Sequence, residues 1–347
     1  MDYSDYIPDY SDYNYTNEDN FTPHEEPVFH HKSNCLEEAI CLSLLVTSVV
    51  IFLLGFCGNG LVIWICGFKM KKTVNTTWYL SLAISDFVFC SILPFNITYT
   101  VMEEWIFGRF MCKFTSIIMF LNMFSSIFLL VIISVDRCIS VMFPVWAQNQ
   151  RTIKKASIVV AVAWFLAMTL SIPSMIFRDV DSHMGKTICF NKYTLSQHSH
   201  MLVAVIRFLV GFIGPFIIII ICYSIIILKL CTNRMTKSTK PFKVMTALVA
   251  AFFMCWLPYH TFILLELKHQ DYDHSLLNTG IRVGTCLAAA NSFLNPVLYV
   301  FMGNDFKRTF KSSMLSRMEN AMVEEDHTIS RFLSRSSSMD GRGSTRI

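Results

Sequence analysis

The chain has 347 residues, enough for two ordinary soluble domains, but 53% of them are hydrophobic and the mean hydropathy is +0.47. This composition excludes an ordinary soluble protein and indicates one that lies in a membrane. The formal net charge of +4 decides little, because the charged residues are segregated along the chain and only their placement is informative. The first residues are polar and acidic and contain no cleavable signal peptide, so we expect the first apolar segment to direct insertion.

Long apolar segments recur along the chain, each with the roughly 20 residues that an α-helix needs to cross about 30 Å of hydrocarbon. Hydrocarbon offers no water to an open sheet edge, which excludes open sheets there. We therefore predict an all-α membrane protein, a seven-transmembrane helix bundle with a short amphipathic eighth helix. The predicted spans are 39–66, 74–102, 109–141, 154–177, 199–230, 243–268 and 276–302.

The connections after the first, third and fifth spans are basic, as Lys71 and Arg151 illustrate. By the positive-inside rule these connections are cytoplasmic. Seven spans then place the N-terminus outside and the C-terminus inside the plasma membrane. The sequons at Asn14 and Asn20 agree, because glycosylation takes place only on the extracellular side. The same topology makes Asn75-Thr76-Thr77 a chance match, since it lies inside.

The chain divides into four regions. Residues 1–38 repeat an Asp-Tyr pair and lack apolar residues for a core, which predicts a disordered acidic extracellular tail. Residues 39–302 form the bundle. Residues 303–315 mix phenylalanine with basic residues, a pattern typical of an amphipathic helix on the inner membrane surface. Residues 316–347 are rich in serine and arginine, which predicts a disordered cytoplasmic tail and a substrate for receptor kinases.

Asp86 lies inside an otherwise apolar span, where a lone charge costs at least about 2.5–3.5 kcal/mol by insertion scales. It therefore needs polar company from other spans. Such a cluster of oxygens suits a small hard cation, so one hypothesis is an allosteric sodium ion. A purely structural polar cluster is the alternative, and we expect no other metal and no cofactor. The residues available to Asp86 are Asn59, Asn122, Ser126, Asn291 and Asn295.

Asp136 and Arg137 follow the third apolar run and lie at the cytoplasmic end of that helix. For an isolated Asp-Arg, an ion pair that anchors the helix at the interface is the simpler interpretation.

Pro258 and Pro296 each remove a backbone hydrogen bond from a helix and lie beside aromatic or polar residues, which suits helices that change shape. Trp256, next to the first kink, is equally consistent with core packing.

The topology places Cys112 and Cys189 on the extracellular side, where oxidation is expected, so we predict a disulfide between them. Cys35 is a further extracellular cysteine, either free or bonded to Cys41.

Arg207 lies early in the fifth span, where exposure to lipid is costly. We therefore expect its guanidinium to face a cavity between helices, and the alternative is a side chain that snorkels to the outer interface.

These residues resemble the signatures of rhodopsin-like (class A) G-protein-coupled receptors, and the resemblance covers about residues 35–315. It implies that Asp136, held against Arg137 in the resting state, takes part in activation and G-protein coupling. The matching positions are Asn59, Asp86, Asp136-Arg137-Cys138, Trp164, Pro215, Cys255-Trp256-Leu257-Pro258 and Asn295-Pro296-x-x-Tyr299. The residues assigned to activation are Asp136, Arg137, Trp256, Pro258, Asn295, Pro296 and Tyr299.

Within the class, the chain looks like the formyl-peptide, anaphylatoxin and chemerin receptor branch and is most similar to chemerin receptors. Segments that carry this likeness include Lys69-Met70-Lys71-Lys72, Pro144-Val145-Trp146, Phe177-Arg178-Asp179 and Leu264-Leu265-Glu266-Leu267. The resemblance implies a peptide or protein chemoattractant, chemerin first, that contacts Arg178, Arg207 and Glu266. It also implies an inhibitory-class G protein, arrestin, receptor kinases and membrane lipids as partners, in leukocyte chemotaxis and inflammation, and no nucleic acid.

Several other functions compete with this one. A receptor for formyl peptides, anaphylatoxin or a lipid mediator fits the same branch, and a scavenging receptor that binds without signalling shares its fold. A transporter should show two related halves with broken helices, which seven spans with one deep carboxylate fit poorly. We find no catalytic motif in the spans and do not expect an enzyme. The chain departs from the wider class in having no cysteine after Cys286, so palmitoylation below the seventh helix is not available.

Overall fold

A computed structural model describes residues 39–302 apart from 184, 193–196 and 233–239, together with 308, 309 and 312. The predicted N-terminal tail, with both sequons, lies outside the described residues, as do the predicted C-terminal tail and most of the predicted amphipathic helix. Cys41 is disulfide-bonded, and its partner also lies outside the described residues. Cys35, the candidate partner, is in that undescribed part of the chain.

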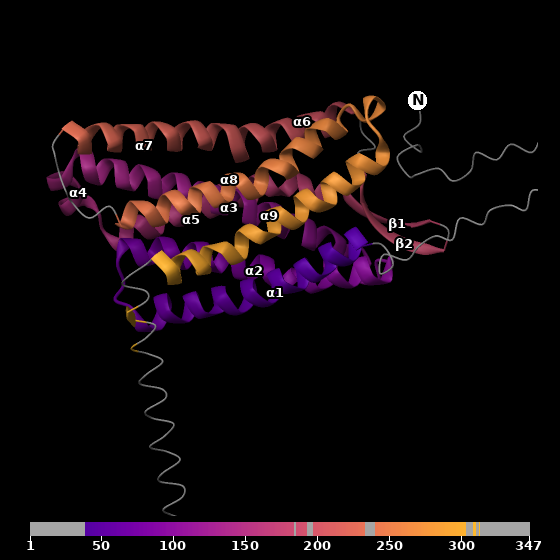
Figure 1. Ribbon diagram of the computed structural model, residues 1–347, viewed down its shortest axis with the longest axis horizontal. Coiled ribbons are helices and arrows are strands. Elements are labelled where there is room, and N and C mark those ends of the chain that lie inside the picture. Colours follow the sequence, from indigo (N-terminus) through magenta and orange to yellow (C-terminus); the bar gives the residue numbers. More distant parts are fainter. Residues whose placement is uncertain are drawn as a thin grey trace, which may run out of the picture.

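Long helices lie side by side in one bundle (Figure 1). They follow the predicted spans. Two of the spans contain a π-helical turn, η2 or η3, in which the helix is locally wider than an α-helix. In chain order they are α1 Ala39–Trp64 with η2 Ile65–Lys69, α2 Val74–Met102, α3 Gly108–Met142, α5 Ile153–Ile176, α6 Gln197–Phe208 with η3 Leu209–Ile213 and α7 Gly214–Thr232, α8 Lys240–Glu266, and α9 His274–Met302.

Six stretches of the described residues are long and apolar enough to cross a membrane, from Ala39–Lys69 to Thr246–Glu266. α9 is not among these six. It nevertheless packs against α8 and α1 and occupies the place of the predicted seventh span (Figure 1). The prediction of an all-α membrane protein is confirmed.

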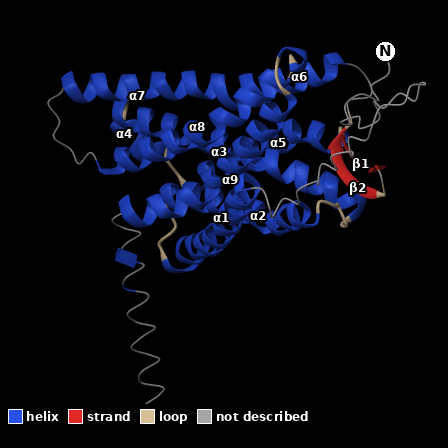
Figure 2. Cartoon of the chain, turned by 45° about the vertical axis from the view of Figure 1, so that its right-hand side comes forward, coloured by secondary structure: helices blue, strands red, loops and turns tan. Residues whose placement is uncertain are grey.

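Short elements that the apolar pattern did not predict lie in the connections. Pro144 starts the short helix α4 Pro144–Gln150, where its fixed φ suits the first turn of a helix and its missing N–H is not needed. The antiparallel strands β1 Arg178–His183 and β2 Lys186–Asn191 form a hairpin that turns at Gly185, whose φ of +78° favours glycine. The hairpin projects beyond the helices (Figure 2), so its open edges do not conflict with the exclusion of open sheets from hydrocarbon. A further short element is the 3-10 turn η4 His269–Asp271.

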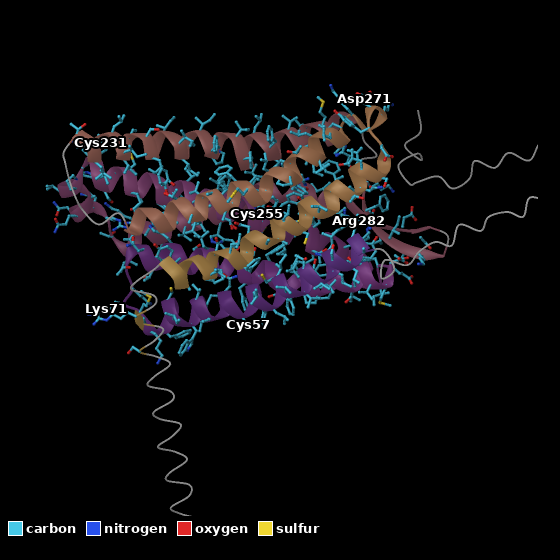
Figure 3. The ribbon with its side chains drawn as sticks, viewed as in Figure 1. Cys57, Lys71, Cys231, Cys255, Asp271 and Arg282 are labelled. Atoms are coloured by element: carbon cyan, nitrogen blue, oxygen red, sulfur yellow. A yellow bond between two sulfur atoms is a disulfide. The ribbon has the colours of Figure 1, made fainter. Side chains whose placement is uncertain are left out.

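The bundle has two chemically different ends. Lys71 and Cys231 lie at one end, which also holds α4 and is called the basic end below (Figures 1 and 3). Asp271 lies at the opposite end with β1 and β2, called the hairpin end. α8 and α9 lie very close together at Gly284 of α9. A Cβ at this position would lie only 2.8 Å from the backbone nitrogen of Tyr259 in α8. Glycine thus allows α9 to pack on α8 just after its Pro258 kink.

Candidate functional site

Asp86 in α2 is completely buried, with an exposed fraction of 0%. Its Oδ1 accepts a hydrogen bond of 2.8 Å from Nδ2 of Asn122 in α3, and its Oδ2 accepts one of 2.7 Å from Nδ2 of Asn295 in α9. Each carboxylate oxygen therefore has a polar partner from a different helix. These bonds offset part of the cost of keeping the group inside the bundle.

Ser126 and Asn291 complete the set predicted around Asp86. Ser126 lies one helical turn after Asn122, and Asn291 lies one turn before Asn295. The Ser126 Oγ and the Asn291 Oδ1 are buried and have no hydrogen-bond partner among the described residues. These two oxygens accept no hydrogen bond from any described residue and belong to the same helices whose asparagines contact the Asp86 carboxylate. Such a set of oxygens suits a small hard cation.

Three serines that the sequence did not single out extend this polar centre. The hydroxyls of Ser85 and Ser125 lie 2.5 Å apart, and the Ser292 Oγ donates to the Asn122 Oδ1 over 3.4 Å. A serine in an apolar helix carries little signal in a sequence, because its hydroxyl is able to bond to a carbonyl of its own helix. Only the packing of α2, α3 and α9 shows that these three contribute to one polar centre.

Asn59 was expected beside Asp86 but has a different role. Its Nδ2 donates to the Gly55 carbonyl over 2.9 Å and to the Ser292 carbonyl over 2.8 Å. Asn59 therefore joins α1 to α9 through the backbone of Ser292, and its Oδ1 is buried without a hydrogen-bond partner among the described residues.

At the basic end of α3, Asp136 does not hold Arg137 as the resemblance implied. Asp136 accepts two hydrogen bonds from Arg151, of 2.8 Å from Nε to Oδ1 and 2.9 Å from Nη2 to Oδ2. Arg137 donates from Nη2 to the Oδ1 of Asn75 over 2.6 Å. The expected pairing is therefore wrong for this structure, because a guanidinium from the segment before α5 engages both carboxylate oxygens. From the sequence, Asn75 was interpreted only as part of a chance sequon and Arg151 only as a charge in a connection.

Trp256 lies in the middle of α8 and is only 2% exposed. Its ring meets the ring of Tyr259 edge-on, with 5.7 Å between centroids, and Pro258 interrupts the helix between them. Trp256 thus packs as a core residue beside a helix that lacks one backbone hydrogen bond. In α9, Pro296 is buried, whereas the side chain of Tyr299 lies outside the described part of the chain.

Arg207 in α6 is buried near the hairpin end, with an exposed fraction of 8%. Its Nη2 donates to the Ser174 Oγ of α5 over 2.8 Å, and its guanidinium lies 3.6 Å from the centroid of the Phe120 ring of α3. The Arg207 Nε is buried and has no hydrogen-bond partner among the described residues. The side chain therefore points between helices, not toward the outer interface, and keeps one unused donor.

His260 of α8 lies near the charge of Arg207, and no pattern in the sequence singled it out. It is 2% exposed, and its ring centroid lies 5.7 Å from that of Phe208 and 5.2 Å from that of Phe212. Its Nε2 is buried without a hydrogen-bond partner among the described residues. A histidine in an aromatic stretch of a span resembles ordinary core packing, so only the structure shows this second unused polar atom.

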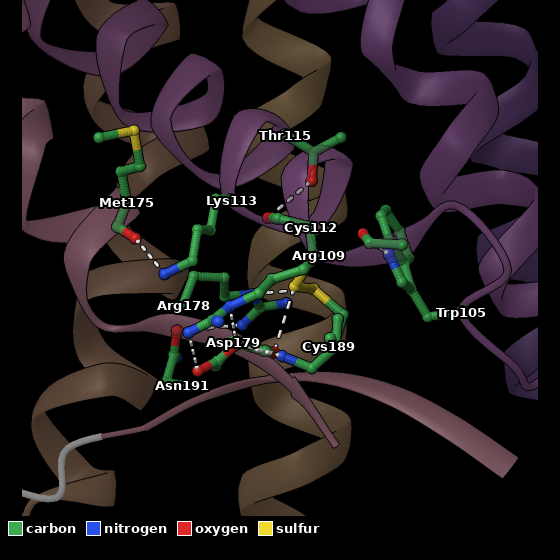
Figure 4. The surroundings of a disulfide bond; sticks show 12 residues. Trp105, Arg109, Cys112, Lys113, Thr115, Met175, Arg178, Asp179, Cys189 and Asn191 are labelled. Atoms are coloured by element: carbon green, nitrogen blue, oxygen red, sulfur yellow. Dashed lines mark hydrogen bonds and ion pairs between the residues drawn. A yellow bond between two sulfur atoms is a disulfide. The ribbon is translucent and has the colours of Figure 1, made fainter. Parts of the chain in front are cut away.

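The other two predicted ligand contacts lie close to the hairpin end. Glu266 ends α8, and its Oε2 lies 4.0 Å from Nε2 of His200 in α6. Arg178 begins β1 and donates to the Cys189 Sγ over 3.2 Å and to the Asn191 Oδ1 over 3.0 Å (Figure 4). These contacts engage Arg178 across the hairpin, whereas the Arg207 guanidinium is bonded to α5.

The predicted disulfide between Cys112 and Cys189 is confirmed and joins α3 to β2 (Figure 4). Beside it, the Arg109 Nε lies 2.7 Å from the Asp179 Oδ1 and the Arg109 Nη2 lies 2.9 Å from the Asp179 Oδ2. Burial acts to raise the pKa of Asp179, but the Val180 amide and the Arg109 guanidinium outweigh it and hold that pKa below its usual value. The hairpin is thus tied to α3 by a covalent bond and an ion pair.

Residues 58–299 match the family described as 7 transmembrane receptor (rhodopsin family). The chain therefore belongs to this family of G-protein-coupled receptors; it is a multi-pass receptor of the plasma membrane and not an enzyme.

Its relatives carry the names of one branch of that family. Chemerin-like receptor 1 of Homo sapiens is 49% identical over 300 residues, which are 81% of this chain and 80% of that receptor. Chemerin-like receptor 1 of Sus scrofa is 44% identical over 342 residues, 91% of this chain and 93% of that receptor. Formyl peptide receptor-related sequence 6 of Mus musculus is 39% identical over 313 residues, 86% of this chain and 92% of that protein. The branch inferred from sequence motifs is confirmed.

Proposed function

We propose that the chain is a receptor for chemerin that signals through an inhibitory-class heterotrimeric G protein and through arrestin. One observation carries this proposal: the buried Arg207 guanidinium, with an Nε–H that no described residue uses, lies between helices near the hairpin end. A fork of N–H donors suits a carboxylate, such as the C-terminus of a peptide inserted end-first. The names of relatives at 44% and 49% identity support chemerin as the source of that carboxylate.

In this proposal the hairpin end is extracellular and the basic end is cytoplasmic. The positive-inside rule supports this orientation, because the basic connections gather at one end. Arg178 on the hairpin and Glu266 at the end of α8 form the rim that the ligand passes. Receptor kinases and arrestin act on the serine-rich residues 316–347, and lipids surround the spans.

The proposed activation involves movement and no covalent chemistry. An agonist shifts the equilibrium between the resting and active arrangements only to the extent that it binds the active one more tightly. The kinks at Pro258 and Pro296, with Trp256 packed beside the first, are the hinges for that shift. Arg137 then turns to the G protein, and a sodium ion at Asp86 favours the resting arrangement.

The test is a ligand screen on cells that express the chain. Chemerin C-terminal peptides, formyl peptides, anaphylatoxin and lipid mediators are applied separately, and forskolin-raised cyclic AMP and arrestin recruitment are read. Chemerin peptides are expected to lower cyclic AMP at the lowest concentration. A response to another ligand alone reassigns the agonist, and chemerin binding with neither readout indicates a scavenging receptor.

A further inference from the structure

At the basic end of the bundle, one amide oxygen holds two guanidinium groups. The Oδ1 of Asn75, in the first turn of α2, accepts a 2.6 Å hydrogen bond from Nη2 of Arg137 and a second one from Nη2 of Arg151. Arg151 at the same time donates to both oxygens of Asp136, over 2.8 and 2.9 Å. Four side chains from α2, α3 and the segment before α5 thus form one network.

The charges in this network explain why Asn75 matters to Arg137. The two arginines and the one carboxylate carry a net charge of +1, and the bidentate contact commits Asp136 to Arg151. Among the described residues, the side chain of Arg137 has its hydrogen bond with Asn75, while its Nε is buried without a partner. The Asp136 and Arg151 side chains are only 13% and 28% exposed, so water screens them less than it screens an open surface pair.

Asn75 is itself held in a fixed place. Thr73 caps α2, with the Thr76 amide donating to the Thr73 Oγ1 over 3.2 Å and the Thr73 amide donating to the Thr76 Oγ1 over 2.7 Å. Such a reciprocal cap fixes the first helical turn. The Asn75 oxygen is therefore a fixed point on α2 from which Arg137 must detach to move.

We propose that Asn75 is a positioning residue that holds Arg137 in its resting orientation, and that Arg151 makes this possible by occupying Asp136. The proposal rests on the proposed role of Arg137 in G-protein coupling. In the resting receptor, Arg137 of α3 is then restrained by the amide of Asn75 in α2. The carboxylate of Asp136, its neighbour in α3, does not restrain it. Activation then breaks the hydrogen bond between Arg137 and Asn75.

Two substitutions at Asn75 test the proposal because they act in opposite directions. Asn75→Ala removes the acceptor, so agonist-free nucleotide exchange on an inhibitory-class G protein should rise. The expected shift of the resting-to-active equilibrium is about tenfold, equivalent to about 1.4 kcal/mol. Asn75→Asp places a carboxylate between the two guanidinium groups and should lower both agonist-free exchange and the maximal exchange with a chemerin C-terminal peptide. General damage to the fold does not produce changes of opposite sign at one position.

Thr77→Ala is the matched control. The Thr77 hydroxyl donates to the Thr73 carbonyl over 3.0 Å in the same turn and takes no part in the network. This change also removes the Asn-x-Thr pattern, as both Asn75 variants do, so exchange should stay at the wild-type level. All variants are compared in membranes at equal receptor number.

A double-mutant cycle tests the part assigned to Arg151. In Arg151→Gln, Asp136 is free to take Arg137, so Asn75→Ala should raise exchange much less than it does in the wild-type background. Equal effects in the two backgrounds overturn the role of Arg151.

Wild-type agonist-free exchange in Asn75→Ala, or a change of the same sign in both Asn75 variants, overturns the proposal itself. Arg137→Ala separates this failure from that of the proposed function. If Arg137→Ala abolishes exchange while the Asn75 variants are neutral, only the restraint is wrong; if exchange persists without Arg137, its coupling role is wrong.

Discussion

Asn295 of α9 donates to the buried carboxylate of Asp86 in α2 over 2.7 Å, across 209 positions of sequence. Asn295 directly precedes Pro296, so this bond ties the kinked part of α9 to α2. A movement of α9 that carries Asn295 away from α2 must stretch or break this bond. The sodium ion proposed at Asp86 would draw on the same carboxylate oxygens, so its binding would be thermodynamically linked to the position of α9.

Sodium is therefore expected to weaken agonist binding. Replacing sodium with a bulky organic cation at constant ionic strength should raise agonist affinity by about fivefold or more, the low end of typical allosteric coupling. Competition binding in membranes measures this effect. Asp86→Asn removes the carboxylate and should make the two salts equivalent. If affinity in the wild type is the same in both salts, the polar centre is purely structural.

Arg137→Ala is expected to reach the cell surface and bind agonist but to lose the cyclic AMP response. The physical reason is that the guanidinium is the group proposed to meet the G protein once it leaves Asn75. Lys154→Ala serves as the control, because Lys154 is an exposed cation in the first turn of α5 at the same end and loses the same unit charge. A full response in Arg137→Ala at matched expression would refute the assignment.

Deleting residues 2–20 is expected to slow association of a full-length basic ligand far more than it speeds dissociation. The segment repeats Asp-Tyr pairs, and sulfation of the tyrosines would add negative charge that steers a basic protein toward the bundle. Association rates at low and high salt provide the measurement, since screening should reduce the difference. Unaltered association at low salt counts against steering.

The long helices and the partners of Asp86 were predictable because the membrane imposes requirements on the sequence for both. A span needs an unbroken apolar run, and a carboxylate within such a run requires polar partners from other runs. Asn122 and Asn295 were found in this way. The disulfide between Cys112 and Cys189 followed from the topology, which placed both cysteines on the side where oxidation is expected. The same reasoning failed for Asn59, because its amide nitrogen donates to the backbone carbonyls of Gly55 and Ser292, a use that leaves no pattern in the sequence.

The connections were not predictable in the same way. β1, β2 and α4 are short, and their positions depend on turns and on contacts with α3 that leave no periodic pattern. Asn75 and Arg151 were passed over because each lies beside a helix end, where polar residues are ordinary. Their importance arises only when the start of α2 and the segment before α5 meet at Asp136 and Arg137.

Arg207 carries the sharpest test of the ligand site. The residue is 8% exposed; its guanidinium is hydrogen-bonded to Ser174 and stacked on Phe120, and its Nε has no hydrogen-bond partner among the described residues. A carboxylate bound there gains a charge-assisted hydrogen bond in surroundings with little water. Arg207→Gln should therefore weaken an acid-ended agonist by about 2–5 kcal/mol, the usual cost of truncating one partner of a buried charge pair.

The partner group on the agonist is identified by amidating the C-terminus of the same peptide. If the terminal carboxylate meets Arg207, amidation should reduce potency on the wild type by a comparable factor and have little further effect on Arg207→Gln, because both changes remove the same interaction. Lys113→Gln is the charge-matched control. The Lys113 Nζ donates to the Met175 carbonyl over 3.1 Å beside the hairpin (Figure 4), so its loss should leave the free-acid and amide agonists as different as they are on the wild type. Equal potency of the free acid on the wild type and on Arg207→Gln, at matched surface expression, would mean that the buried arginine serves only the packing of α3, α5 and α6.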